Sequence, residues 1–232
     1  MTRKDKRKIL ELQDERLISL ANPKSPIAEQ FRTIRTNIEF SSPDADLRTI
    51  VVTSPNQAEG KSTITANIAV VFAQQGKRVL VIDSDLRKPT VHCIFHIENH
   101  IGLSNILTRQ ATLEKTVKIT KQENLWVLTS GPIPPNPLEL LSSIGMSALL
   151  EKAKNEYDII ILDSPPVLAV TDAQVLSSLT DGVVLVVSNG KTKIDSAKKT
   201  KELLESVKAK ILGVILNNKK VQENQYYYYG GK

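Results

Sequence analysis

The fold of this chain is decided by the stretch Thr49-Ile50-Val51-Val52-Thr53-Ser54-Pro55-Asn56-Gln57-Ala58-Glu59-Gly60-Lys61-Ser62-Thr63. Its first five residues are all β-branched, as is typical of a buried strand, and helix-compatible residues run from Lys61 to about Gln75. The loop between them ends in Gly-Lys-Ser, the sequence with which a strand–loop–helix unit binds phosphate through backbone amides and a helix N-terminus. This order of elements predicts a Walker A loop rather than a chance Gly-Lys-Ser.

The residue types in this loop suggest roles toward a nucleoside triphosphate. The Lys61 ammonium is expected to reach the β and γ phosphates, and the Ser62 hydroxyl is expected to hold Mg²⁺. Pro55 stands where the general pattern has its first glycine. The loop residues expected to bind the cofactor ATP are Ala58, Glu59, Gly60, Lys61, Ser62 and Thr63.

Aspartates follow two further apolar runs of the chain. Asp83 and Asp85 come after residues 79–82, and Asp163 comes after residues 159–162. Because open α/β sheets bind ligands beyond the carboxyl ends of their strands, these carboxylates should lie beside the loop. Asp163 is expected to be a Walker B partner of Mg²⁺, while the other two offer a metal contact and a base for an attacking hydroxyl. Any single one of them could instead cap a helix. We predict as catalytic residues Lys61, Asp83 and Asp85, and as metal ligands Ser62, Asp83 and Asp163.

The rest of the chain has the alternation of a single α/β domain. Its 232 residues, 41% of them apolar, are enough for one substantial core. Apolar runs alternate with helix-compatible segments, which predicts a P-loop NTPase-like, three-layer α/β fold with a mostly parallel central sheet. Further strands are expected near residues 78–83, 125–128, 158–162, 183–187 and 211–216. Further helices are expected over residues 27–39, 138–154 and 193–208, with an irregular loop over residues 132–137.

The two ends of the chain differ in composition from its middle. Residues 1–26 are expected to form a basic tail and linker, residues 27–220 the P-loop domain, and residues 221–232 a flexible tail. Much of the net charge of +6 lies in the first eight residues, which could approach anionic lipid or nucleic acid or be simply solvated. The last segment holds four of the five tyrosines, either as a functional cluster or as an aromatic element that packs on a partner.

Composition argues against several other classes of protein. No apolar run approaches the roughly 20 residues of a membrane span, and no run of signal-peptide length follows the basic N-terminus. Cys93 is the single cysteine, which excludes an internal disulfide and a cysteine cluster for zinc. We therefore expect a cytoplasmic protein, without a nucleic-acid partner.

Three further features carry less information. His92, His96 and His100 are spaced by four, but the residues after them predict the end of a helix, so a metal site is disfavoured. Trp126 lies in a short apolar run and is expected in the core. Asn217 ends the last expected strand and could contact the adenine of ATP or form a turn.

Several motifs of this chain occur together in one known family. They are Glu59-Gly60-Lys61-Ser62-Thr63, Asp83-Ser84-Asp85-Leu86-Arg87-Lys88-Pro89, Gly131-Pro132-Ile133-Pro134-Pro135-Asn136-Pro137, Leu162-Asp163-Ser164-Pro165-Pro166 and the terminal tyrosines. Over residues 25–232 the chain resembles the bacterial tyrosine kinases of capsular and extracellular polysaccharide synthesis, in the Gram-positive form that is separate from its membrane adaptor. The resemblance implies an ATP- and Mg²⁺-dependent tyrosine kinase that regulates this synthesis. It also implies autophosphorylation, in a neighbouring subunit, of Tyr226, Tyr227, Tyr228 and Tyr229.

The same resemblance implies partners. Glu29, Arg32 and Arg35, three residues apart in turn, match a motif that joins subunits of this family into a ring, although this spacing also fits a solvated helix face. Other implied partners are tyrosine-containing protein substrates and a transmembrane adaptor that completes the nucleotide site and recruits the kinase to the inner face of the cell membrane. The family usually has Pro-Gly where this chain has Gln57-Ala58, and the added methyl group should restrict the loop and lower catalytic efficiency.

Two other functions are compatible with the fold. One is a partitioning or positioning ATPase, a class with a second lysine four residues before the last glycine of the loop, where this chain has Asn56. The other is a nucleotide-responsive regulator of a membrane polymerase that uses its tail as a binding element.

Overall fold

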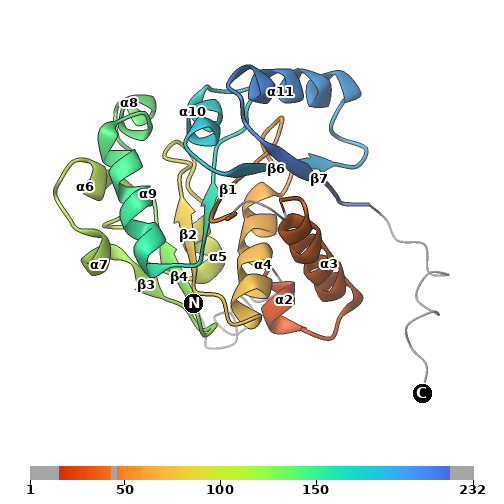
Figure 1. The fold of residues 1–232 in the computed structure, drawn as a ribbon, viewed down its shortest axis with the longest axis horizontal. Coiled ribbons are helices and arrows are strands. Elements are labelled where there is room, and N and C mark those ends of the chain that lie inside the picture. Colours follow the sequence, from red (N-terminus) through yellow and green to blue (C-terminus); the bar gives the residue numbers. More distant parts are fainter. Residues whose placement is uncertain (1–15, 43–45, 220–232) are drawn as a thin grey trace, which may run out of the picture.

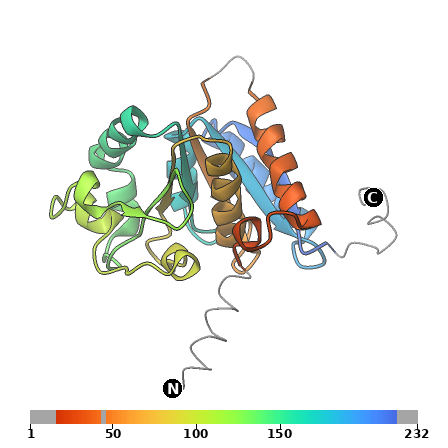
Figure 2. The same ribbon diagram turned by 90° about the horizontal axis from the view of Figure 1, so that it is seen from below.

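The protein forms a seven-stranded sheet between two layers of helices (Figures 1 and 2) in a computed structural model that describes residues 16–42 and 46–219. The strands lie in the order β3-β4-β2-β5-β1-β6-β7, and all neighbours are parallel except β3, which pairs antiparallel with β4. The strands are β1 (Thr49–Thr53), β2 (Val79–Asp83), β3 (Lys118–Ile119), β4 (Leu125–Leu128), β5 (Ile159–Asp163), β6 (Gly182–Ser188) and β7 (Ile211–Asn217). The predicted fold class is confirmed.

The helices cover both faces of this sheet. They are α2 (Ile18–Ala21), α3 (Pro26–Phe40), α4 (Lys61–Gln74), α5 (Val91–Phe95), α6 (Leu103–Leu107), α7 (Leu113–Thr116), α8 (Pro137–Leu141), α9 (Ile144–Glu156), α10 (Asp172–Ser178) and α11 (Ile194–Ser206). None of the described helices is long and apolar enough to cross a membrane.

Alternate residues of the strands belong to two separate hydrophobic cores, one on each face of the sheet. In β1, Ile50 and Val52 belong to the core that contains α3 and α4, whereas Val51 belongs to the core that contains α8 and α9. This separation follows from the two-residue period of a strand that is buried on both faces. Helix α4 is buried around most of its circumference because α3 covers its outer side, with Phe31 and Ile38 in the same core.

The order of the strands brings the acidic residues together. Strand β5 lies between β1 and β2, so that Asp163 pairs in register with Val52 on one side and with Asp83 on the other. The carboxyl ends of these three strands therefore meet at one edge of the sheet, next to the loop that follows β1.

Two expectations from the sequence need correction. The segment 138–154 is not one helix but two, because the Ser143 backbone is extended (φ −73°, ψ 155°) and its hydroxyl accepts a hydrogen bond from the Met146 amide at 3.3 Å, as an N-cap does. Trp126 is only half-buried and packs against the border of the core that contains α8 and α9. Its ring packs edge to face on Tyr157 with centroids 5.5 Å apart. The basic N-terminus and Tyr226 to Tyr229 lie outside the described residues.

Candidate nucleotide-binding site

The loop between β1 and α4 has the backbone of a phosphate-binding loop with one strained residue. Gly60 adopts φ 91°, and a Cβ atom added there would lie 2.2 Å from Asn217 Nδ2, so only glycine fits. Ala58 also adopts a left-handed conformation, with φ 59°. A residue with a Cβ atom loses about 1 kcal/mol relative to glycine in this region. The sequence predicted that Ala58 restricts the loop, and in the structure this alanine does adopt backbone angles that glycine reaches more easily.

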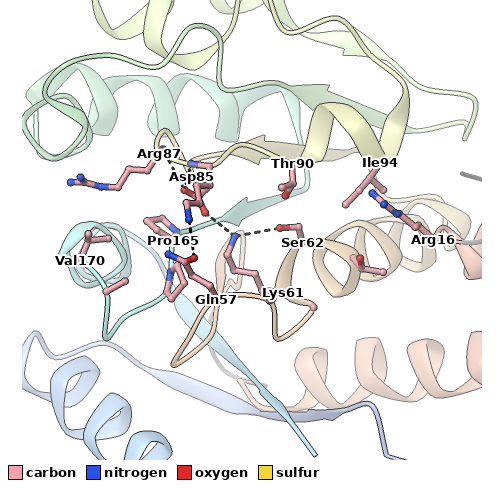
Figure 3. Close-up of a pocket in the computed structure, with 16 residues that line it drawn as sticks. Arg16, Gln57, Lys61, Ser62, Asp85, Arg87, Thr90, Ile94, Pro165 and Val170 are labelled. Carbon is pink, nitrogen blue, oxygen red and sulfur yellow. Dashed lines mark hydrogen bonds and ion pairs between the residues drawn. The ribbon is translucent and has the colours of Figure 1, made fainter. Parts of the chain in front are cut away.

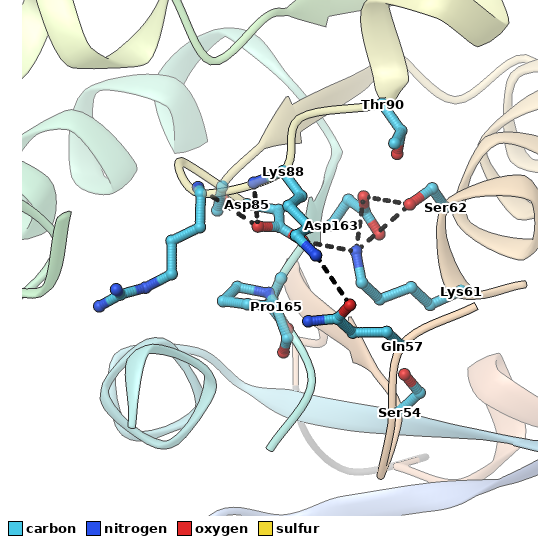
Figure 4. A network of polar contacts seen from close by, with 12 residues as sticks. Ser54, Gln57, Lys61, Ser62, Asp85, Lys88, Thr90, Asp163 and Pro165 are labelled. Carbon is cyan, nitrogen blue, oxygen red and sulfur yellow. Dashed lines mark hydrogen bonds and ion pairs between the residues drawn. The ribbon is translucent and has the colours of Figure 1, made fainter. Parts of the chain in front are cut away.

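Lys61, the first residue of α4, lies among buried carboxylates (Figure 4). Its Nζ atom is 3.1 Å from Asp85 Oδ2 and 3.2 Å from Asp163 Oδ2. The Ser62 hydroxyl donates to the same Asp163 oxygen at 2.6 Å. Lys61 therefore contacts three other predicted site residues, Ser62, Asp85 and Asp163, the last of which is 102 positions away in the chain.

Asp83 completes this cluster from the end of β2. One carboxylate oxygen, Oδ2, accepts hydrogen bonds from the Thr90 and Val91 amides at 3.1 and 3.0 Å, so Asp83 does cap the start of α5. The other oxygen, Oδ1, is buried without a hydrogen-bond partner among the described residues. Burial and the neighbouring Asp163 raise the pKa of Asp83 well above its ordinary range. An orphaned carboxylate oxygen of this kind is a ready ligand for a cation.

Burial and ion pairing act in opposite directions on the pKa of Lys61, and likewise on the pKa of Asp163. Burial raises the pKa of Asp163, and the nearby Lys61 ammonium opposes this shift. Burial lowers the pKa of Lys61, but Asp163 and Asp85 more than offset this effect, and the net shift is upward. The lysine therefore carries its charge at neutral pH, as binding to phosphate oxygens requires.

The oxygen atoms of the cluster fit Mg²⁺ bound together with phosphates. Ser62, Asp83 and Asp163 offer one hydroxyl and two carboxylates, the hard oxygen ligands that Mg²⁺ prefers. Within the described ranges, no three His, Cys, Asp or Glu side chains are arranged to hold a metal by themselves. Mg²⁺ needs no such group, because it usually takes one or two carboxylates plus substrate phosphates.

A cleft of about 600 Å³ opens above the loop (Figure 3). Its size is in the range of nucleotide and cofactor sites. Lys61, Ser62 and Asp85 line it, and Pro165 and Val170 form part of an apolar wall. Three basic residues without a predicted role also line this cleft: Arg16, Arg87 and Lys88. Arg87 and Lys88 belong to the motif that starts at Asp83, and their place in this motif could have indicated that they lie at the site.

Two predicted ATP-binding side chains are engaged within the protein. The Glu59 carboxylate is fully buried and accepts hydrogen bonds from the Asn56 amide at 3.0 Å and the Thr192 hydroxyl at 2.6 Å. The Asn217 side chain donates to the Glu59 carbonyl at 2.9 Å, so it supports the loop from outside. Contact of Asn217 with adenine stays a prediction.

The three residues of the expected subunit motif do not share one environment. All lie on α3, where Glu29 and Arg32 form an exposed ion pair. Arg35 instead turns inward and donates to the carbonyl of Val71 in α4 at 3.1 Å. Their role between subunits stays a prediction, and Arg35 has in addition a contact within its own chain.

The three histidines are not gathered on one helix. His92 lies in α5, which ends at Phe95, and His96 follows with φ 56°. The four-residue spacing therefore does not place His92, His96 and His100 on a common helix face.

Known proteins that are similar to this chain identify its family. Residues 47–221 match the family described as AAA domain. Tyrosine-protein kinase YwqD of Bacillus subtilis (strain 168) is 53% identical over 217 residues, which cover 93% of this chain and 92% of that protein. The putative tyrosine-protein kinase CapB of Staphylococcus aureus is 45% identical over 210 residues, which cover 90% and 92%, respectively. The crystal structure of the chimerical protein CapA2B2 matches with a TM-score of 0.87 and 47% identity, over 89% of this chain and 91% of that one.

These relatives decide between the functions that the fold allows. Both match over nine-tenths or more of their length and are named as tyrosine kinases, which favours a kinase over a partitioning or positioning ATPase. The chain therefore belongs to the family of bacterial tyrosine-protein kinases, with an AAA domain that carries its phosphate-binding loop.

Proposed function

We propose that this chain transfers the γ-phosphoryl group of ATP to tyrosine hydroxyls, with Mg²⁺ as the metal. The observation that carries the proposal is the contact of Lys61 and Ser62 with two strand-end aspartates at the mouth of a phosphate-binding loop. Phosphoryl transfer needs little covalent chemistry from a protein, and positioning together with charge stabilisation supplies most of the rate.

Each side chain has a distinct part in this proposal. Lys61 binds the β and γ phosphates and balances the charge that grows on them. Ser62, Asp83 and Asp163 hold Mg²⁺, which neutralises the phosphates when bound. Asp85 lines the cleft and is 4% exposed, and it accepts the proton of the attacking tyrosine hydroxyl.

We propose the tail tyrosines as substrates, phosphorylated by a neighbouring molecule. Strand β7 ends beside the phosphate-binding loop, where Asn217 contacts the Glu59 carbonyl. A flexible linker of seven residues, the separation of Lys219 and Tyr226, would span roughly 15 Å on average, so the proposal has to be tested against transfer within one molecule. Only a mixing experiment separates the two routes.

The proposal extends to an assembly at the membrane. A ring of subunits would use Glu29, Arg32 and Arg35, and a transmembrane adaptor would recruit the kinase to the inner face of the membrane. There it would regulate capsular or extracellular polysaccharide synthesis. This part is supported by the resemblance described above and by the relatives that the chain matches.

The test mixes two full-length chains in the presence of ATP and Mg²⁺. One is Lys61→Met with all tyrosines, and the other is active but has phenylalanine at positions 226–229. We expect phosphotyrosine on the tail of the inactive chain. If that tail stays unlabelled while the wild type labels itself, transfer between molecules is wrong. A second inactive chain, Asp83→Asn, guards against poor folding of the first.

A further inference from the structure

The outer side of the phosphate-binding loop is held by the segment between β6 and α11. The Lys191 ammonium donates to the carbonyls of Gln57 and Ala58 at 3.1 and 2.8 Å. The neighbouring Thr192 hydroxyl donates to the Glu59 carboxylate at 2.6 Å. Two adjacent residues, more than 130 positions away along the chain, thus contact three consecutive residues of the loop.

These contacts fix the direction of the peptide groups. In a trans peptide the C=O and the following N–H point in opposite directions. Lys191 holds the carbonyls of Gln57 and Ala58, and Asn217 holds the carbonyl of Glu59. The N–H groups of residues 58, 59 and 60 must therefore point away from these donors, and none of the three donates a hydrogen bond to another described residue. Successive N–H groups on one side of a loop form an anion-binding nest.

The loop needs this external support more than a glycine-containing loop would. Ala58 adopts φ 59°, which an alanine reaches only at a cost, so the loop alone does not favour this shape. The Glu59 carboxylate has no solvent exposure, and apart from Thr192 its hydrogen-bond donors all come from Asn56 within the same loop. Thr192 is the donor that connects this carboxylate to the rest of the fold.

We propose that Lys191 and Thr192 are positioning residues, which hold the loop in its phosphate-binding shape and so set the affinity for ATP. The inference rests on the proposed function of the same loop. Neither residue needs to touch the nucleotide, because both act through the loop backbone and through Glu59.

The test measures binding and activity separately in the full chain. Lys191→Met keeps the length of an exposed side chain but loses the ammonium. We expect the Kd for ATP, measured by calorimetric titration in the presence of Mg²⁺, to rise about tenfold, which corresponds to about 1.4 kcal/mol. KM for ATP should rise in parallel, with kcat for tyrosine phosphorylation within about twofold. Thr192→Val should act in the same direction, and Thr192→Ser, which retains the hydroxyl, should restore wild-type affinity.

Controls separate this inference from folding and from the proposed function. Lys193→Met removes a charge two residues away, on a side chain that is exposed, and should leave Kd unchanged. Thermal unfolding without nucleotide should be the same for Lys191→Met and Lys193→Met. An unchanged Kd in Lys191→Met, or the same loss in Lys193→Met, would overturn the inference. If Lys61→Met also retained ATP binding and phosphorylation, the proposed site itself would be wrong.

Discussion

Replacement of Lys61 by methionine should destabilise the protein as well as inactivate it. The Nζ atom lies 3.1 Å from Asp85 and 3.2 Å from Asp163, and all three side chains are at most 11% exposed. At an effective dielectric constant near 20, each contact is worth about 5 kcal/mol before the cost of desolvation. Removal of one partner from a buried ion pair usually costs 3–5 kcal/mol, because it leaves charge buried and unpaired.

The loss should lie near the lower end of this range. Burial already raises the pKa of Asp83 and Asp163, so these carboxyls can take up a proton when the lysine is gone. We therefore expect the free energy of unfolding to fall by about 3 kcal/mol and the melting temperature by roughly 10 °C without nucleotide. Tyrosine phosphorylation should disappear, since the β and γ phosphates lose their cation.

Urea unfolding at neutral pH without nucleotide measures this effect. Lys193→Met serves as a surface control, and the double variant Lys61→Met with Asp85→Asn should recover about half of the lost stability, because one unpaired charge is removed. Equal stability of Lys61→Met and wild type would show that the ion pairs contribute nothing. Undiminished phosphotyrosine would refute the assignment of the site.

Three further predictions concern other parts of the chain. Asp83→Asn should lower the turnover of tyrosine phosphorylation by at least about 100-fold while ATP affinity falls less, and normal turnover would leave Asp83 as only a helix cap. Glu29→Ala with Arg32→Ala should give monomers in light scattering; Arg35 is retained because it bonds to α4, and an unchanged mass would favour a solvated face. Hydrogen bonds from Arg78 lower the pKa of Asp158 from 3.8 to about 2. The ionised Asp158 therefore contributes to the free energy of unfolding above pH 3.8, and this contribution is lost as the pH falls through about 2. Asp158→Asn should therefore lose about 0.5 kcal/mol in urea unfolding at pH 7, and a difference that persists at pH 2 would contradict this.

The grouping of the central side chains could be predicted because each of them has a local sequence signal. Lys61 and Ser62 belong to a contiguous motif, and Asp83 and Asp163 each follow an apolar run. A general rule about the carboxyl ends of parallel strands then brings the parts together. That rule does not predict the direction in which each carboxylate points. The hydrogen bond by which Asp83 caps α5 is therefore seen only in the structure.

Other contacts had no comparable signal. Lys191 and Thr192 follow a strand without any motif. They become neighbours of residues 57–59 because β6 pairs in parallel with β1, the strand that leads into the loop. Trp126 lies in an apolar run, and the sequence does not show that its side chain lies at the border of the core, beside Tyr157. The break before α9 did have a signal, since Ser143 is a favoured N-cap residue within a segment of otherwise helical composition.

The insertion of β5 between β1 and β2 has a consequence for synthesis of the protein on the ribosome. The phosphate-binding loop and Asp83 are made first, but the strands that carry them are not neighbours in the finished sheet. Their common neighbour is completed only at Asp163, 80 positions after Asp83. A nascent chain that ends before β5 has the loop, its lysine and Asp85, but it lacks both the strand that joins the two halves of the sheet and Asp163, the second carboxylate that pairs with the lysine. The complete site therefore forms only after this long-range pairing is made.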